Sequence, residues 1–219
     1  MQITLISSTP NPDHVVYAAA RQCYSTDTAA NFVHDPDPML VSNLLKKVLS
    51  MGHESVLEHA SFTFAIEGIS RACSHQLVRF RIASFSQQSQ RYCTVKEQFP
   101  YVTPDSITEK YEPEFHAAMR YLAELYESMI KRGVPAEDAR FVLPNACCTN
   151  IVMTMNAREL LHAFRLRCCT HAQWEIRDLF QRILSICKKS APLIFANAGP
   201  TCVTEGICRE GSRSCGRIK

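Results

Sequence analysis

The sequence predicts a mixed α/β fold. Two long stretches, residues 39–51 and 114–132, place apolar side chains at helical spacing. Two shorter stretches, residues 61–66 and 149–155, have the length and composition of strands, and the first alternates polar and apolar residues. Because helical and strand-like segments follow one another along the chain, neither an all-helical nor an all-β architecture fits.

Size and charge restrict the class of protein. The chain has 219 residues, 46% of them hydrophobic and 21% charged, so it can bury a substantial core. We expect one globular domain over residues 1–197 and a Gly- and Cys-containing C-terminal tail over residues 198–219. The formal net charge is only +3, which suits a small anionic ligand better than a long polyanion. Residues 1–13 do not resemble a secretory signal and no apolar run reaches spanning length, so we expect a cytoplasmic protein.

The first half of the chain opens with an expected strand at residues 2–7. The expected elements that follow are a helix over 14–24, a polar loop with Pro36 and Pro38, a helix over 39–51 ended by Gly52, a turn over 53–59, a strand over 61–66 and a short helix over 68–80. In that short helix, Arg71, His75 and Arg79 are four residues apart and would share one face. The segment 81–91 reads as a loop.

The second half contains the strongest helical pattern, at 114–132. The other expected elements are a strand over 92–95, a Pro-containing segment over 100–113, a short helix after Pro135, a strand over 149–155, a helix over 157–167 with Asn156 as N-cap, and a helix over 173–188. Arg167 falls in line with the apolar residues Leu160 and Phe164. Its stem could simply lie along the core, or a partly desolvated guanidinium could polarise a ligand carbonyl.

The stretch of residues 79–91, RFRIASFSQQSQR, has the composition of an anion site. No Asp, Glu or Lys occurs between Arg71 and Arg91, while Arg79 and Arg81 add fixed positive charge. Guanidinium groups bind phosphates bidentately, and Ser and Gln side chains can read a base or a sugar, so a nucleotide suits this mixture. The ordinary alternative is a solvated helix end followed by a polar loop.

The eleven cysteines do not read as a disulfide framework. Their number is odd and two pairs are adjacent, Cys147 with Cys148 and Cys168 with Cys169, so we expect reduced thiols, most of them buried as small apolar residues. Residues 198–219 contain Cys202, Cys208 and Cys215 without a Cys-x-x-Cys spacing, and no metal is predicted.

Several separated blocks, in the same order along residues 1–195, resemble the flavin-dependent thymidylate synthases (the ThyX family). The signature of that family is Arg-His-Arg followed after seven residues by Ser, and here it reads Arg79, Phe80, Arg81 and Ser89. The further matching blocks are GHESVLEH at 52–59, ARFVLP at 139–144, Asn156-Ala157-Arg158 with His162, and Arg167 followed by HAQWEIR at 171–177. Two residues depart from the family: Phe80 replaces its His, and Gln87 stands where many members have Glu.

The resemblance implies a fold with a small sheet flanked by long helices, assembled as a homotetramer with active sites at subunit interfaces. It implies FAD as cofactor, held by Ser55, Arg79, Phe80, Arg81, Gln87, Asn156, Arg158 and His162, with His53 as a further contributor. It implies dUMP as substrate, bound by Gln76, Arg79, Gln87, Gln88, Ser89, Arg91, Arg140 and Arg167, with Arg167 as the catalytic residue. An aromatic ring at Phe80 could still stack on the flavin.

The implied reaction moves the one-carbon unit of 5,10-methylenetetrahydrofolate to uracil C5 of dUMP and reduces it with a hydride from FADH2. The products are dTMP and tetrahydrofolate, and NADPH reduces the flavin again. A nucleophilic role for Ser89 is disfavoured because no histidine lies near it in the motif, and no cysteine lies in a motif known from the flavin-free synthases. The alternatives are a catalytically lapsed flavin-binding paralogue and a nucleotide-binding module without catalysis, including an RNA-contacting one.

Overall fold

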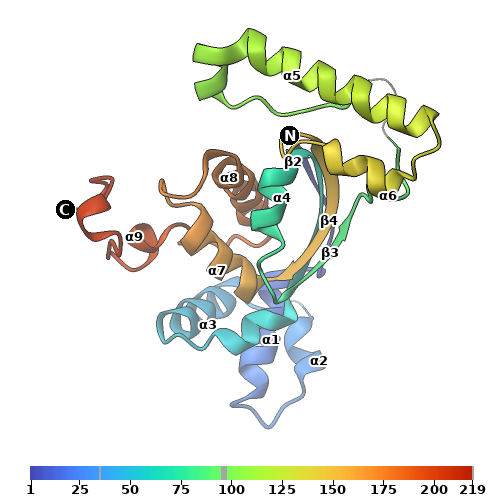
Figure 1. The fold of residues 1–219 in the computed structure, drawn as a ribbon. Helices are drawn as coiled ribbons and strands as arrows, with labels where there is room; N and C mark the ends of the chain where they lie inside the picture. The colour runs from blue at the N-terminus through green and yellow to red at the C-terminus, as the bar shows by residue number, and fades with distance from the viewer. Residues whose placement is uncertain (35, 95–97, 219) are drawn as a thin grey trace. The chain divides into compact units, whose positions relative to one another are not determined.

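The computed structural model describes residues 1–34, 36–94 and 98–218. Within them lies a four-stranded antiparallel sheet with the order β1-β2-β4-β3 (Figure 1). The strands are β1 (Gln2–Ser8), β2 (Ser61–Ser70), β3 (Ala83–Gln87) and β4 (Cys148–Asn156). The predicted mixed α/β class, with a small sheet among helices, is confirmed.

The chain forms two compact units that interleave along the sequence. Unit 1 contains residues 1–2, 66–79 and 85–152, and unit 2 contains residues 3–65, 80–84 and 153–219. Every strand therefore contributes residues to both units. The boundary predicted between residues 197 and 198 falls inside unit 2 and stays a prediction.

Polar contacts between neighbouring strands fix the register of the sheet. In unit 2, the Thr63 and Thr154 hydroxyls of β2 and β4 are 3.0 Å apart. In unit 1, the Gly68 N–H donates to Asn150 Oδ1 over 3.0 Å. Gly68 has φ +69°, a left-handed conformation that β-strand residues with a side chain rarely adopt, and this allows β2 to continue to Ser70. The predicted alternation holds, because Phe62, Phe64 and Ile66 are fully buried.

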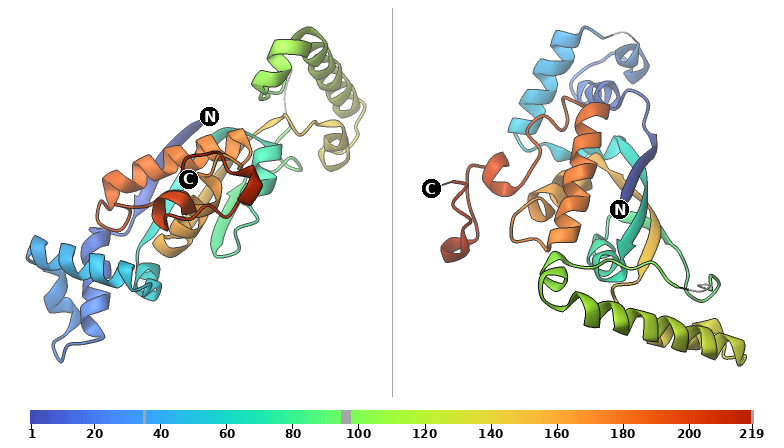
Figure 2. Two further views of the ribbon diagram at one scale, coloured as in Figure 1. Left: turned by 90° about the vertical axis from the view of Figure 1, so that its left-hand side faces the viewer. Right: turned by 90° about the horizontal axis from the view of Figure 1, so that it is seen from above.

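Three helices of unit 2 pack together: α1 (Pro12–Gln22), α2 (Ala29–Val33) and α3 (Pro38–Ser50) (Figure 2). Helix α3 begins where Asp37 Oδ1 accepts the Met39 N–H over 2.8 Å, and Gly52 follows it with φ +70°. The predicted helices over 14–24 and 39–51 are confirmed within two residues. Helix α2 was expected to be loop, because five residues are too few for a periodic pattern.

The core of unit 2 lies between α7 (Ala157–Arg167) and α8 (Trp174–Ser190). Asn156 caps α7 as predicted, since its Oδ1 accepts the Glu159 N–H over 2.9 Å. The predicted apolar face of α8 is fully buried, namely Ile176, Leu179, Phe180, Ile183 and Cys187. Unit 2 also contains η1 (Glu54–His59), α9 (Thr201–Thr204) and η3 (Gly211–Arg213).

Unit 1 contains α4 (Arg71–Leu77), α5 (Asp105–Lys131), α6 (Ala136–Ala139) and η2 (Arg140–Val142). Helix α5 packs Met119 and Ala123 against Phe99 and Cys147. The stretch consists of two helices that meet at a kink at Tyr111, with φ −138°. Pro113 lies at the start of the second helix, where its missing N–H leaves no hydrogen bond unmade, and the predicted start at residue 114 is close to this point.

Three sequence predictions near the motif are wrong. The helix expected over 68–80 is only α4, because the Ser70 hydroxyl accepts the Cys73 N–H and sets its start. The loop expected over 81–91 contains strand β3. Of the strand expected over 92–95, residues 92–94 are not extended in a sheet, and Val95 lies outside the described residues.

Among the residues that the structure describes, no helix is long and apolar enough to cross a membrane. None of the eleven cysteines, all of which the structure describes, forms a disulfide, but only four are buried, so the expectation that most are core residues is wrong.

Candidate functional site

In unit 1, two of the predicted site residues, Arg91 and Arg140, contact the same residue, Glu137. Arg91 makes a two-pronged contact with Glu137 Oε2, through Nε at 2.9 Å and through its terminal nitrogen at 2.8 Å. Arg140 Nε donates to the backbone oxygen of the same residue over 3.0 Å. Arg91 is about half exposed and Arg140 is half-buried, so each guanidinium keeps some surface that a ligand can reach.

Arg71 adds a third guanidinium to this cluster. Its pKa is lowered, first by burial and also by the positive charge of Arg140, while the nearby Cys147 opposes the shift. Glu137 offsets one of the three positive charges, so the cluster of Arg71, Arg91 and Arg140 keeps an excess of positive charge that suits an anionic ligand.

Gln87 is fixed at the end of β3 by two hydroxyl groups. Its Nε2 donates to Ser74 Oγ over 2.9 Å and to Thr149 Oγ1 over 3.2 Å. The next two residues are held by backbone contacts: the Gln88 N–H donates to the oxygen of Asn150 over 2.9 Å, and Ser89 Oγ accepts the Arg91 N–H over 3.2 Å. Gln87, Gln88 and Ser89 are thus ordered before any ligand binds.

Gln76 and Arg79 were expected on one polar face of a helix. Gln76 lies on α4 and is half-buried, but α4 ends at Leu77, so Arg79 follows the helix and is exposed. The predicted alignment of Arg79 with Arg71 and His75 is therefore wrong. Its exposure leaves Arg79 available to a ligand.

In unit 2, Arg167 is held over an aromatic ring. Its guanidinium carbon is 5.6 Å from the centroid of Phe80, and Phe80 also meets Phe180 and His162 edge to face at 5.5 and 6.2 Å. Phe80 is only 7% exposed. The ring of Phe80 therefore packs against the guanidinium of Arg167. The expected stacking of Phe80 on a flavin stays a prediction.

Acidic residues of η1 hold the N-terminal end of α7. Arg158 lies 2.5 Å from Glu58 and 3.7 Å from Glu54, and Glu54 in turn lies 2.7 Å from Arg165. The Glu58 hydrogen bond raises the pKa of the Arg158 guanidinium. Because α7 packs on η1, these ion pairs join η1, which carries the predicted residue Ser55, to both the first and the last turn of α7.

The outer face of α7 presents a second cationic group. Arg158 and His162 are one helical turn apart and both are exposed, as is Ser55 on η1. Arg81 is exposed as well. A guanidinium, an imidazole and a hydroxyl form a donor set that suits a ligand with phosphate groups.

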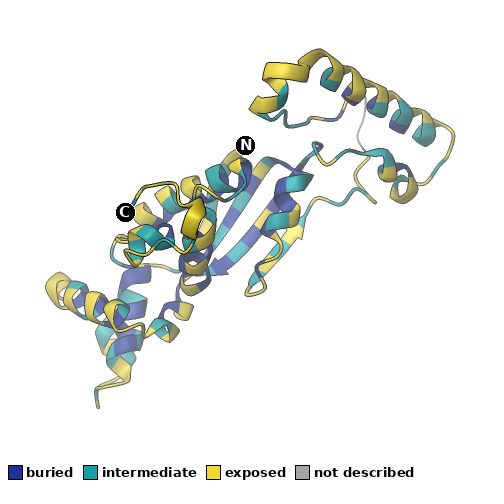
Figure 3. Ribbon diagram, turned by 60° about the vertical axis from the view of Figure 1, so that its left-hand side comes forward, coloured by how far each residue is buried: buried dark blue, intermediate teal, exposed yellow. Residues whose placement is uncertain are grey.

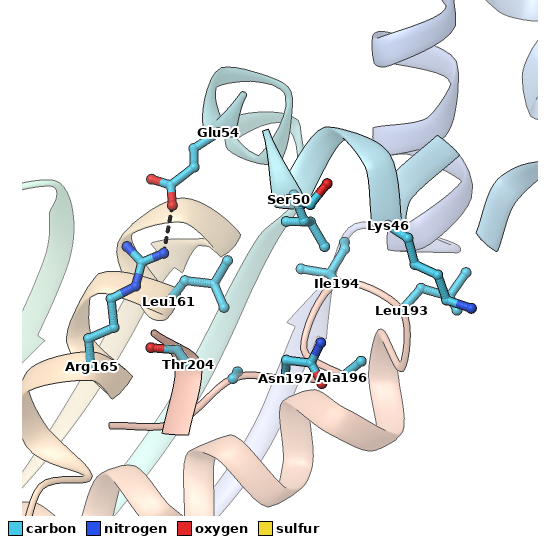
Figure 4. Close-up of a pocket in the computed structure, with 12 residues that line it drawn as sticks. Lys46, Ser50, Glu54, Leu161, Arg165, Leu193, Ile194, Ala196, Asn197 and Thr204 are labelled. Carbon is cyan, nitrogen blue, oxygen red and sulfur yellow. Dashed lines mark hydrogen bonds and ion pairs between the residues drawn. The ribbon is translucent and has the colours of Figure 1, made fainter. Parts of the chain in front are cut away.

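A cavity of about 480 Å³ opens in unit 2 beside this ion-pair network (Figure 4). Glu54 and Arg165 form one wall, Lys46 of α3 lies at the other end, and Leu193 and Ile194 come from the segment after α8. None of the sequence-predicted site residues lines it.

Several supporting residues were not predicted from the sequence. Glu137, Ser74, Thr149, Glu54 and Glu58 each hold a predicted site residue. Glu137 could have been found, since it precedes Arg140 by three residues on a predicted helix. The hydroxyl partners of Gln87 are 13 and 62 residues away, and no local pattern indicates them.

The chain is thus a mixed α/β protein in which each unit carries one group of guanidinium and polar side chains. The sequence model described as thymidylate synthase complementing protein matches residues 4–193. A flavin-dependent thymidylate synthase of Geobacter sulfurreducens is 54% identical over 220 residues, which cover 99% of this chain and 94% of the relative. Proteins of that name from Clostridium tetani and Pyrococcus abyssi are 45% and 44% identical, over 99% and 96% of this chain and 94% and 90% of theirs.

The chain therefore belongs to the thymidylate synthase complementing protein family, that of the flavin-dependent thymidylate synthases.

Proposed function

We propose that this protein is a flavin-dependent thymidylate synthase that converts dUMP to dTMP, with 5,10-methylenetetrahydrofolate as carbon donor and NADPH as reductant through FAD. The observation that carries this function is the 54% identity, over 99% of the chain, to a relative named for that activity. The geometry of the two cationic groups supports the individual roles that follow.

The arginines of unit 1 are our candidates for dUMP. Arg91 and Arg140, positioned by Glu137, together with Arg79 and Ser89, would hold the phosphate. Bidentate guanidinium contacts are the strongest phosphate contacts that side chains make. Gln76, Gln87 and Gln88 would read the sugar or the base, since neutral amides offer both donors and acceptors.

The exposed donors of unit 2 fit FAD. Arg158 and His162 on α7, with Ser55 on η1 and Arg81, match the negative charge of a pyrophosphate. Asn156 uses its Oδ1 to cap α7, so its amide nitrogen is the group left for a ligand. We also assign Arg79, Gln87 and Phe80 to the flavin, as the motif implies. When bound in its reduced form, FAD would supply the hydride that reduces the transferred one-carbon unit.

Arg167 is our candidate for activating the pyrimidine. Uracil C5 is a weak nucleophile, and it attacks a one-carbon donor more readily when negative charge develops on the ring at N3 and the carbonyl oxygens. A guanidinium that is half-buried over Phe80 is screened less than one in water, so it stabilises this charge more strongly. Arg167 would act electrostatically and would not need to transfer a proton, since a guanidinium stays charged.

We further propose a cytoplasmic homotetramer with active sites at subunit interfaces. The argument is one of surface: three ligands, FAD, dUMP and a folate, need more concave area than one chain of this size usually offers. The size of the assembly follows from light scattering on the purified protein, and a monomer at working concentration would contradict it.

The decisive experiment follows the visible spectrum of the purified protein anaerobically. NADPH is added with and without dUMP, then methylenetetrahydrofolate is added, and dTMP is measured. We expect a flavin absorption that NADPH bleaches, faster with dUMP present, and dTMP formation with all components. The test variant is Arg167→Lys, which should retain flavin and dUMP binding but lose turnover. The matched control is Arg182→Lys on the exposed face of α8, which should retain binding and turnover.

Three other outcomes reject parts of the proposal. A flavin that binds but is not reduced by NADPH indicates a catalytically lapsed paralogue. A protein that takes up dUMP but no FAD indicates a nucleotide-binding module. A fully active Arg167→Lys variant would show that the planar guanidinium is not needed and would remove Arg167 from its assigned role.

A further inference from the structure

The cavity of about 480 Å³ in unit 2 has the size of a ligand site, and none of the candidate residues for dUMP or FAD lines it. Small-molecule sites usually enclose about 300–1,000 Å³. Helices α3, η1 and α7 line the cavity together with the chain after α8. Glu54 and Arg165 stand at one end and Lys46 at the other, with Leu161 and Ile194 between them (Figure 4). The lining is therefore polar at its ends and apolar in its middle.

The cavity runs from the core of unit 2 to its surface. Leu161 of α7 and Ile194 after α8 both line the cavity and are buried, so it reaches the edge of the core. Thr204 lines it from α9, in the segment 201–218, whose residues are exposed or intermediate throughout (Figure 3). A ligand would thus find apolar contact inside and a way in from solvent.

Hydrogen bonds hold the wall after α8 in place. Asp13 of α1 accepts the N–H groups of Leu193 and Ile194 through its two carboxylate oxygens, each over 3.1 Å. Further along this wall, the Ala198 N–H donates to the oxygen of Phe195 over 3.1 Å. Because these bonds fix backbone that lines the cavity, the cavity is formed before a ligand binds, as is usual for small-molecule sites.

The Glu54 end of the cavity carries a small excess of negative charge. Arg165 pairs with Glu54 over 2.7 Å and lies 3.9 Å from Glu205. Arg158 lies 2.5 Å from Glu58 and 3.7 Å from Glu54. Two guanidinium groups thus share three carboxylates, which more than balance their charge. An anionic group of a ligand is disfavoured at this end, because like charges repel.

The opposite end carries a positive charge that is not balanced. Lys46 of α3 is exposed, and within the described part of the chain its ammonium has no ion-pair or hydrogen-bond partner. An exposed lysine alone indicates no site, but this one stands at the mouth of a cavity with aliphatic side chains. There an ion pair and the burial of an alkyl chain can act on the same ligand.

We propose that this cavity binds a small aliphatic monocarboxylate, at a site separate from the candidate residues for dUMP and FAD. The alkyl chain lies on Leu161, Leu193 and Ile194, and the carboxylate pairs with the ammonium of Lys46. The acidic Glu54 end sets the orientation of the ligand, because it disfavours a charged group there. No aromatic side chain lines the cavity, which suits an alkyl chain better than a ring that would stack.

The test titrates the full-length protein with octanoate in a calorimeter. We expect one octanoate per chain. Octan-1-ol, which lacks the charge, should bind at least about 5-fold more weakly, because it cannot pair with the ammonium group. Octanedioate, whose second carboxylate would meet the acidic end, should also bind at least about 5-fold more weakly than octanoate. Equal binding of all three would overturn the assigned charges and orientation.

Two neighbouring lysines of α3 give a matched pair of variants. Lys46→Met should weaken octanoate binding at least about 5-fold. Lys47→Met is the control and should bind octanoate like the unchanged protein, since Lys47 lines a different cavity, with Tyr17 and Arg21. Both lysines are exposed, so both variants should fold.

Photocrosslinking locates the ligand without relying on affinity. An octanoate that carries a diazirine is irradiated with the protein, and mass spectrometry should find the label on Leu161 or on residues 193–198. None of these readouts uses thymidylate synthesis, so they do not depend on the proposed function. The proposal is overturned if octanoate does not bind, if Lys46→Met binds it as Lys47→Met does, or if the label falls outside the residues that line this cavity.

Discussion

Gln87 stands where many members of the family have Glu, and its contacts explain how a neutral amide can occupy this position. The amide nitrogen donates to Ser74 and Thr149, both of which are buried. The Ser74 hydroxyl gives its one proton to the Arg71 backbone oxygen over 3.0 Å, so towards residue 87 it can only accept. An amide nitrogen supplies the donor that this arrangement needs, whereas a carboxylate would require Ser74 to give up its bond to Arg71.

The first prediction concerns this contact. Gln87→Leu should lower the free energy of unfolding by about 1–3 kcal/mol, because two buried hydroxyls lose a partner. Gln88→Leu, one residue on and exposed, should change it by less than about 0.5 kcal/mol. Urea unfolding of both variants measures the difference, and equal losses would show that the amide bonds do not order β3.

Phe80 is the second departure, and its place under Arg167 gives a second prediction. Phe80→Leu removes the cation–π contact, which is worth about 0.5–2 kcal/mol, so kcat should fall between about 2-fold and about 30-fold with little change in KM for NADPH. The matched control is Phe195→Leu, whose ring packs edge to face with Phe62 and Phe164.

Both variants should lose stability, since both rings are buried, but only Phe80→Leu should lose turnover after correction for the folded fraction. Phe80 acts here as a positioning residue. Equal kcat values in the two variants would show that Phe80 does not contribute to the function of Arg167.

At the scale of the element, Asp13 joins the start of α1 to the end of the α8 region. Its two carboxylate oxygens accept the N–H groups of Leu193 and Ile194, each over 3.1 Å. Burial raises the pKa of Asp13 from its ordinary 3.8, an effect that these two N–H donors and His14 oppose. The native state therefore takes up this proton more readily than the unfolded chain.

A pH dependence follows from that shift. A raised folded pKa stabilises the native state most at low pH, and this contribution is lost as pH rises from 3.8 through the folded value. Asp13→Asn cannot titrate, so the unfolding free energy of the unchanged protein, minus that of the variant, should decline from about pH 3 to about pH 7. A flat difference in urea unfolding would contradict the raised pKa.

The accuracy of sequence-based prediction differs between elements for physical reasons. Helices α7 and α8 were predicted almost to the residue, because a cap at Asn156 and a full apolar face at Ile176 to Cys187 are local signals. Strand β3 was missed, because its polar Ser and Gln side chains read as loop and only its pairing with β4 makes it a strand. The end of α4 was placed three residues too late, at residue 80 instead of Leu77, so the predicted face of Arg79 was wrong.

The candidate site shows the same division. The resemblance to a family supplied the candidate ligand-binding residues, whose roles stay proposals. Of the residues that hold them, Glu137 has a local signal three residues before Arg140, but Glu54 and Thr149 have none. Such partners are set by tertiary contacts between segments up to about a hundred residues apart, which one sequence does not encode in a readable pattern.

At the scale of the whole molecule, the cysteines should fall into reactivity classes that a single experiment can order. Burial raises the pKa of Cys147 and of Cys168 to about 11 and raises that of Cys187 still further. Cys23 and Cys93 are exposed. Because the thiolate is the reactive form, exposed cysteines should alkylate at least about 100-fold faster near neutral pH than these three.

Mass spectrometry of the native protein after timed iodoacetamide treatment measures these rates. Cys187 labelling as fast as Cys23 would contradict the described core of unit 2.

The interleaving of the two units has a consequence for how this chain can be divided. The polypeptide passes from one unit to the other after residues 2, 65, 79, 84 and 152. No single cut yields either unit as a continuous fragment. The change of unit after residue 79 even separates Arg79 from Phe80 within the signature motif. Neither cationic group can therefore be inherited, deleted or exchanged as one continuous segment. A shortened gene that retained one group would remove segments that the other unit needs in order to fold.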